Sequence, residues 1–207
     1  MMHAMRRFVT VGLVLLASAL VAVSTPGVYA AAATPSSVNG LALTPPPPPN
    51  ATCETTGDGI FCHGAFTFSD TNVPAGFSCG NSFAVLVSDT GTIRYELHYN
   101  SAGLLLEAKI LRNSQGTFIN SVTGKTIGND SHNSTTLDLA TPGDLNSATA
   151  TVTGAIGIAT GQSIGLVAHD VGKIVFDPSG NILFEGGPHN SIDNPPAFVQ
   201  AICTALS

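Results

Sequence analysis

The stretch TIRYELHY, residues 92–99, decides the fold class because polar and apolar side chains alternate along it without a break. Its apolar positions are Ile93, Tyr95, Leu97 and Tyr99. In an extended chain successive side chains point to opposite faces, so a period of two is typical of a β-strand with one face on a core and one in water.

Turn-forming residues follow at positions 100–103, and the alternation resumes from Leu104. Two alternating runs joined by such a turn predict a β-hairpin. The same pattern recurs at residues 149–158. Further strands are predicted at residues 60–68, 83–88, 117–121 and 135–139.

Near the C-terminus, residues 173–176 and 181–184 flank the turn sequence DPSG, residues 177–180. Proline sets φ early in a turn and glycine takes a left-handed conformation at its end, so a tight hairpin is predicted. Both faces of its two strands are apolar, which indicates a central place in the sheet. After it, Asp193 or Asn194 with Pro195 predicts the start of a C-terminal helix.

The whole pattern predicts an all-β fold. It favours an antiparallel β-barrel or β-sandwich of about nine to eleven short strands with one C-terminal helix. Residues 1–30 have the basic end, apolar stretch and small-x-small site of a signal peptide. Residues 31–50 form an Ala/Ser/Pro-rich linker that ends in five prolines, and residues 51–207 are expected to form a single β-rich domain.

The acidic net charge of the chain argues against partners that are themselves anionic. The chain has 7 basic and 13 acidic residues, and removal of the leader with Arg6 and Arg7 leaves 5 basic residues and a net charge of −8. A nucleic-acid backbone or an anionic membrane surface needs basic groups to pair with, so neither is an expected partner. No membrane span is expected after cleavage of the leader, and no cofactor is predicted.

All four cysteines follow the predicted leader: Cys53, Cys62, Cys79 and Cys203. An even number in an exported chain predicts two disulfides. Three pairings are possible and the spacing does not choose among them, although Cys53–Cys62 with Cys79–Cys203 is the one we favour. No C-x-x-C pair supports a zinc site instead.

Two pairs of titratable residues flank the late hairpin, so their side chains are expected to meet at one rim of the fold. They are His169 with Asp170, and Glu185 with His189. A carboxylate beside an imidazole orients it and raises its basicity, which suits a general base. These four residues are the candidate catalytic set. The alternative is that they are ordinary loop histidines, because turn-forming residues surround them, and no H-x-H or H-E-x-x-H spacing predicts a metal site.

Two other motifs are interpreted as accidental. GFSCG, residues 76–80, has the form of a nucleophile elbow, but a strand rather than a helix is predicted after it. Gly124-Lys125-Thr126 lacks the earlier glycine of a phosphate-binding loop and is interpreted as a hairpin turn.

The segment GKIVFDPSGNILFEGGPH, residues 172–189, followed by Cys203, is similar to uncharacterised exported proteins of high-GC Gram-positive bacteria. In these a G-x-[IVL]-V-F-D-x-x-G-x-[IVL]-x-F hairpin precedes a terminal Cys. The resemblance implies a secreted β-rich domain and assigns no functional residue.

Three functions remain open from the sequence. The first is a secreted or cell-surface, non-enzymatic domain that binds a small apolar ligand or a surface protein. The second is a small extracellular enzyme that uses the His/Asp/Glu set for acid–base or metal chemistry. The third is a structural component of the cell envelope.

Overall fold

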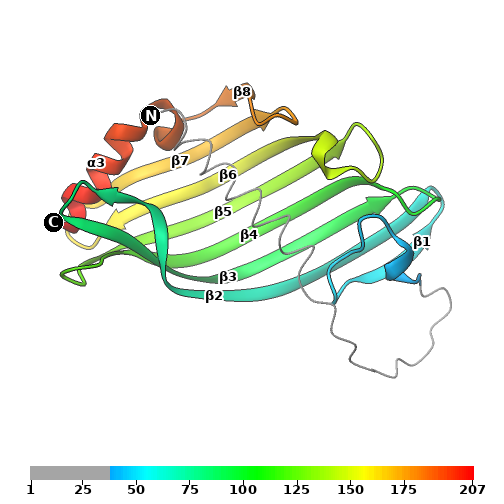
Figure 1. Ribbon diagram of the computed structural model, residues 1–207, viewed down its shortest axis with the longest axis horizontal. Coiled ribbons are helices and arrows are strands. Elements are labelled where there is room, and N and C mark those ends of the chain that lie inside the picture. The colour runs from blue at the N-terminus through cyan, green and yellow to red at the C-terminus, as the bar shows by residue number, and fades with distance from the viewer. Residues whose placement is uncertain (1–37) are drawn as a thin grey trace.

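The computed structural model describes residues 38–207, whose eight strands form one antiparallel sheet (Figure 1). The strands lie in chain order, so each pairs with the strand before it and the strand after it. The sheet is strongly curved and stays open, because its first and last strands do not pair. The predicted signal peptide, residues 1–30, and residues 31–37 of the predicted linker lie outside the described residues.

Most of the strands are long. They are β1 (Thr52–Thr56), β2 (Gly59–Cys79), β3 (Phe83–Tyr99), β4 (Leu105–Asn120), β5 (Thr126–Leu139), β6 (Ala148–Gly161), β7 (Gly165–Phe176) and β8 (Ile182–Gly186). The short helices are η1 (Gly40–Ala42), η2 (Leu145–Ser147), α2 (Asn190–Asp193) and α3 (Pro195–Leu206).

The predicted all-β class with a C-terminal helix is confirmed, but its finer form is corrected. The sheet is not a closed barrel, and residues 38–207 contain no second sheet that would make a sandwich. The strands are also fewer and longer than predicted. β3 joins the predicted strands 83–88 and 92–99, because Gly91 stays in register between Phe68 and Ser114 instead of ending the strand.

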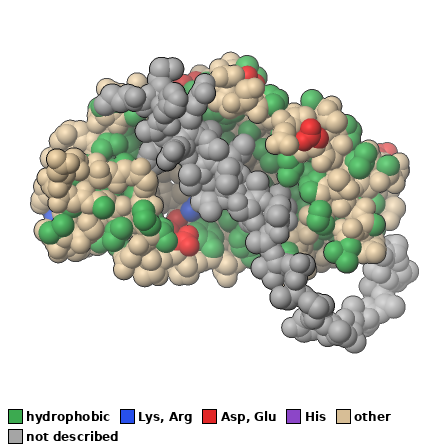
Figure 2. Space-filling model, in the orientation of Figure 1, with side chains coloured by type: hydrophobic (Ala, Val, Ile, Leu, Met, Phe, Trp, Pro, Cys, Tyr) green, Lys and Arg blue, Asp and Glu red, His purple; other side chains and the backbone are tan. Residues whose placement is uncertain are grey.

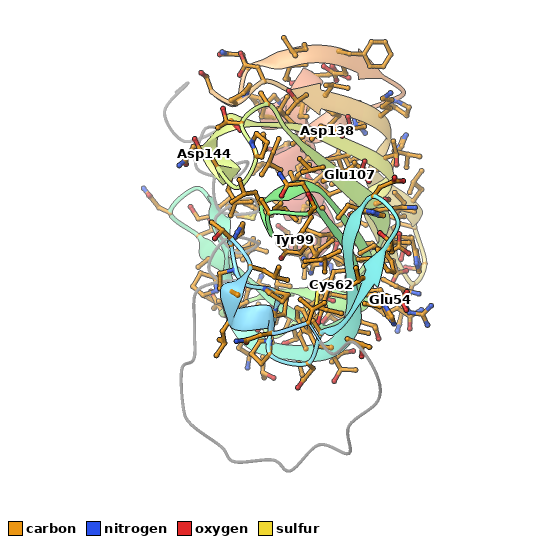
Figure 3. All side chains as sticks on the ribbon, turned by 90° about the vertical axis from the view of Figure 1, so that its right-hand side faces the viewer. Glu54, Cys62, Tyr99, Glu107, Asp138 and Asp144 are labelled. Carbon is orange, nitrogen blue, oxygen red and sulfur yellow. A yellow bond between two sulfur atoms is a disulfide. The ribbon has the colours of Figure 1, made fainter. Side chains whose placement is uncertain are left out.

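Two apolar cores lie on the inner, concave face of the sheet, one at each end. The β1-end core includes Leu43, Cys62, Tyr95, Leu97 and Tyr99. Figure 3 shows Cys62 and Tyr99 on the inside of the curve and Glu54 on its outside. The predicted alternation of residues 92–99 therefore separates the inner face from the outer one.

The second core, the helix-end core, is closed by α3. Ile202 and Leu206 of α3 are completely buried against Val85, Phe118 and other residues of the sheet. Full burial of one such side chain stabilises the fold by about 1.5–3 kcal/mol.

The start of α3 agrees with the prediction. The side chain of Asn194 accepts a hydrogen bond from the backbone N–H of Ala197 over 3.3 Å, and Pro195 occupies the first turn. An Asn cap followed by proline is a favourable helix start, because the Asn side chain accepts from one of the unpaired N–H groups and proline has no N–H to leave unpaired.

Both disulfides have the favoured pairing. Cys53 and Cys62 are cross-strand partners in β1 and β2, so their bond closes a hairpin. Cys79 at the end of β2 is bonded to Cys203 and attaches α3 to the sheet across a sequence separation of 124 residues.

The late hairpin forms as predicted, but its second strand is not central. Gly180 has a φ of 80°, and the backbone N–H of Asp177 donates to the carbonyl oxygen of Asn181 over 2.9 Å. β8 lies at the edge of the sheet, and Ile182, Leu183 and Phe184 are 43%, 63% and 52% exposed. The prediction was wrong because the chain turns into α2 after β8 instead of adding a strand beside it.

The prolines of the predicted linker lie against the sheet. The hydroxyl of Tyr99 donates to the carbonyl oxygen of Pro45 over 3.0 Å, and Thr44 forms a bridge with Leu104. Leu43 is 4% exposed and belongs to the β1-end core. The described part of this segment therefore covers one end of the inner face.

Candidate functional site

A row of polar residues crosses the inner face between the two cores. On β3, Asp89 shares its face with the buried Val85 and Tyr95, and on β4, Arg112 shares its face with the buried Ile110 and Phe118. We call this row the polar belt; its members are Asp89, Arg112, Ser114, Ser131 and Asn133. Figure 2 views this face and shows acidic and basic side chains next to each other between areas of hydrophobic side chains.

The centre of the polar belt is an ion pair. A guanidinium nitrogen of Arg112 donates to Oδ2 of Asp89 over 2.6 Å. The Asp89 side chain is 6% exposed and that of Arg112 is 40% exposed. The guanidinium also lies 4.9 Å from the centre of the Phe68 ring, and its Nε donates to Oγ of Ser114 over 3.4 Å. The guanidinium of Arg112 is therefore held by three contacts while the side chain as a whole stays partly exposed.

Two acceptor positions of the belt differ in how they are satisfied. Asn133 donates to Oγ of Ser131 over 2.7 Å, and this hydroxyl donates in turn to the carbonyl oxygen of Ala155 over 3.4 Å. Oδ1 of Asp89 is buried and has no hydrogen-bond partner among the described residues. A buried carboxylate oxygen without a donor is costly, so this atom is a candidate acceptor for a donor beyond the described residues.

Glycines make room for the belt. A Cβ on Gly91 would collide with the Phe68 ring and with Ser114, and a Cβ on Gly116 would come within 2.9 Å of Cα of Asp89. The absence of a Cβ at these positions leaves room for Phe68 and Asp89. Small and polar residues therefore take the place of a continuous apolar core at mid-strand.

The structure brings three of the four predicted catalytic residues together. Asp170 of β7 forms a β-bridge with His189, and Glu185 lies on the neighbouring β8. Oδ1 of Asp170 accepts a hydrogen bond from the backbone N–H of Ser191 over 2.9 Å. Asp193 joins this group, since its Oδ2 accepts from the backbone N–H of His189 over 3.3 Å. We call Asp170, Glu185, His189 and Asp193 the C-terminal cluster.

His189 is the innermost residue of the C-terminal cluster. Its side chain is completely buried, and its Nε2 lies 3.3 Å from the carbonyl oxygen of Gly186. A carbonyl oxygen only accepts, so Nε2 carries the proton in this contact. Nδ1 is buried and has no partner in the described part of the chain.

Glu185 has a perturbed carboxyl group. Its burial raises the pKa, the neighbouring Asp193 raises it further, and His189 acts in the opposite direction. The group therefore keeps its proton to a higher pH than an ordinary glutamate.

His169 does not join the cluster. It precedes Asp170 directly on β7 and pairs with Ile158 on β6, so its side chain lies on the other face of the sheet. Within residues 38–207, no group of three or more His, Cys, Asp or Glu residues is placed to hold a metal ion. The catalytic role of the four residues stays a prediction.

The polar belt was missed by the sequence reasoning, although a signal for it exists. Asp89 has apolar neighbours on its face of β3, Val85, Val87, Ile93 and Tyr95, and Arg112 follows Ala108 and Ile110 on the same face of β4. A charged residue at an apolar position of a two-residue period is a sign of a buried polar site. The predicted strand 83–88 ends one residue before Asp89, so the prediction did not place Asp89 on a strand face.

A wide, shallow hollow of about 590 Å³ crosses three strands near Gly91. Its lining residues carry no titratable side chain: Thr67, Phe68, Ser69, Thr90, Gly91, Thr92, Asn113, Ser114 and Gln115. Besides the Phe68 ring it offers hydroxyl and amide groups, with no acid, base or nucleophilic pair.

No family model, no curated protein and no solved structure matches the chain. No helix within residues 38–207 has the length and apolar character to cross a membrane. The two disulfides are a property of proteins that fold in an oxidising compartment.

Proposed function

We propose that this protein is an exported, non-enzymatic binding domain that works outside the cytoplasm, in the medium or at the cell surface. The signal-like composition of residues 1–30 and the two disulfides support export. The similarity of residues 172–189 to exported proteins of high-GC Gram-positive bacteria is in keeping with it.

The ligand site of this proposal is the polar belt. One observation carries it: Oδ1 of Asp89 is buried without a donor while the partly exposed Arg112 sits beside it. Evolution of a purely structural ion pair would favour satisfying both oxygens from the chain, since an unpaired buried oxygen costs about 1–3 kcal/mol. A ligand that donates to Asp89 and accepts from Arg112 would complete the pair.

The ligand class follows from these two groups. It presents a donor and an acceptor side by side, as a pair of neighbouring hydroxyl groups or an amide does. An amino sugar with hydroxyl and acetamide groups meets both requirements without adding a net charge. The small apolar ligand expected from the sequence would leave Asp89 unsatisfied.

Titration with N-acetylglucosamine and its linear trimer, followed by amide NMR shifts, tests this function. Shifts are expected at β3, β4 and β5 around the polar belt. Arg112→Gln and Asp89→Asn should weaken binding about tenfold to a hundredfold, because each removes a hydrogen bond to a charged group. Arg94→Gln is the matched control, since Arg94 pairs with Leu111 on the same two strands but is exposed. Absence of shifts at the belt, or equal binding by all three variants, would overturn the proposal.

The alternative function, an acid–base enzyme, has less support. A catalytic imidazole must reach its substrate, and His189 is completely buried. His169 lies on the opposite face of β7 from Asp170.

A further inference from the structure

A second, smaller pocket lies on the inner side of the sheet beside the β2 edge. Its volume is about 180 Å³, and its lining residues come from the proline segment, β2 and β3: Pro48, Pro49, Asn50, Ala65, Phe66 and Tyr95. Apart from Asn50 and the hydroxyl of Tyr95, these walls are apolar. The pocket is distinct from the polar belt, whose residues do not line it.

One polar atom in this pocket wall is unsatisfied. Tyr95 is 4% exposed, and its hydroxyl is buried without a hydrogen-bond partner among the described residues. Burial raises the pKa of this hydroxyl, so it stays protonated and able to donate at neutral pH. A buried hydroxyl without a partner is an exception that calls for an explanation.

The backbone of β2 is shaped around this hydroxyl. Gly64 is the cross-strand partner of Tyr95, and a Cβ at Gly64 would collide with the Tyr95 hydroxyl and ring. Position 64 therefore has to be glycine for the ring to reach the β2 edge. The same ring could have turned its hydroxyl to a carbonyl group, as Tyr99 does with Pro45, but it does not.

Volume and polarity together define the occupant. Apolar cavities of about 150 Å³ in proteins hold one benzene ring, so about 180 Å³ leaves room for a ring and one small substituent. The flat rings of Phe66 and Tyr95 and the two prolines suit an aromatic face. The free hydroxyl of Tyr95 suits a polar substituent.

We propose that this pocket binds a single aromatic ring that carries one hydroxyl group, a phenol-class molecule, with its oxygen hydrogen-bonded to Tyr95. Binding there is independent of the polar belt. Because Pro48 and Pro49 form one wall, an occupied pocket also holds the proline segment against the sheet.

Phenol and toluene form a matched pair of probes, because they have nearly the same shape and differ in the hydroxyl group. Titration of the disulfide-bonded protein with each probe, read by amide shifts at Gly64 and Ala65, should give about tenfold tighter binding of phenol. Tyr95→Phe should abolish this preference and keep toluene binding. Tyr99→Phe is the control and should keep the preference, because the Tyr99 hydroxyl is already paired with Pro45.

A further variant guards against a folding defect in Tyr95→Phe. Phe66→Ala removes an aromatic ring from the pocket wall and should weaken both probes equally. Arg112→Gln should change neither affinity, which separates this proposal from the polar belt. Equal affinities of the wild type for both probes, or shifts confined to other regions, would refute it.

Discussion

Tyr95 and Tyr99 face the same side of β3, yet only the hydroxyl of Tyr99 has a hydrogen-bond partner, the carbonyl oxygen of Pro45 at 3.0 Å. Both residues are buried, at 4% and 3% exposure, so they are alike in exposure and differ in this bond. Comparing Tyr95 with Tyr99 therefore shows how much a hydrogen-bonded buried hydroxyl and an unpaired one each contribute to the stability of the fold.

Removal of the two hydroxyls should therefore have unequal effects on stability. Tyr99→Phe is expected to lower the free energy of unfolding by about 1–2 kcal/mol, since it leaves the Pro45 carbonyl without its donor. Tyr95→Phe should leave the free energy of unfolding unchanged or raise it. Urea unfolding of both variants at pH 7 measures the difference, and equal losses would contradict the assignment of the bond.

The Arg112–Asp89 pair should show strong coupling. Arg112→Met keeps an apolar chain over Phe68 but leaves the buried carboxylate of Asp89 uncompensated, at an expected cost of about 2–3 kcal/mol. Asp89→Asn in the same chain should recover part of this loss. A double-mutant cycle in urea should give a coupling free energy of about 1–2 kcal/mol. Additive effects would show that the two groups do not interact in solution.

Glu185 should give a pH dependence of a defined sign. Its pKa is higher in the folded chain than the ordinary value of 4.5, so the folded state binds the proton more tightly than the unfolded state. The stability from this group is fully present below pH 4.5 and is lost as the pH rises through the raised pKa. Glu185→Gln should therefore gain stability relative to the wild type between pH 4 and pH 8.

Asp177→Asn provides a control of opposite sign for this series. Hydrogen bonds from Asn181 lower the pKa of Asp177, so its contribution is present above its ordinary pKa and is lost as the pH falls. Unfolding curves of both variants at several pH values should diverge from the wild type in opposite directions. Parallel curves for Glu185→Gln and the wild type would contradict the raised pKa.

The two disulfides should differ in what they stabilise. Cys79–Cys203 closes a separation of 124 residues, and its loss is expected to lower the free energy of unfolding by about 5 kcal/mol, because the unfolded chain gains loop entropy. Cys53–Cys62 closes a separation of 9 residues, and its loss is expected to cost about 3 kcal/mol. Paired Cys→Ser variants in thermal unfolding measure this order. Loss of Cys79–Cys203 should also expose the helix-end core, so the variant without this disulfide should bind more of a hydrophobic dye. The reverse order of stability would show that α3 holds to the sheet without its disulfide.

The alternation in residues 92–99 was enough to predict the strand and its two faces, because a period of two leaves no other regular structure. It was not enough to predict where strands end. The predicted strands 83–88 and 92–99 leave out residues 89–91, although Gly91 continues β3 and leaves room for the ring of Phe68. Contacts between residues 23 positions apart decide this, and no local pattern contains them.

The same limit explains the candidate sites. Strand parity alone separates His169 from Asp170, so that part of the prediction could have been corrected from the sequence. The approach of Asp193 and Ser191 to the cluster depends on the path of the chain after β8, where α2 turns back toward β7. Arg112 and Asp89 meet across a strand pair whose register no short motif encodes.

The chain-order pairing of the strands has a consequence for how this protein reaches its folded form. A chain that is synthesised N-terminus first can add each strand to the one already present, so the sheet can grow in the order of the sequence. The helix-end core cannot close in that way, since Ile202, Cys203 and Leu206 arrive last. Folding is therefore completed only when the residues of α3 are available to pack on the sheet.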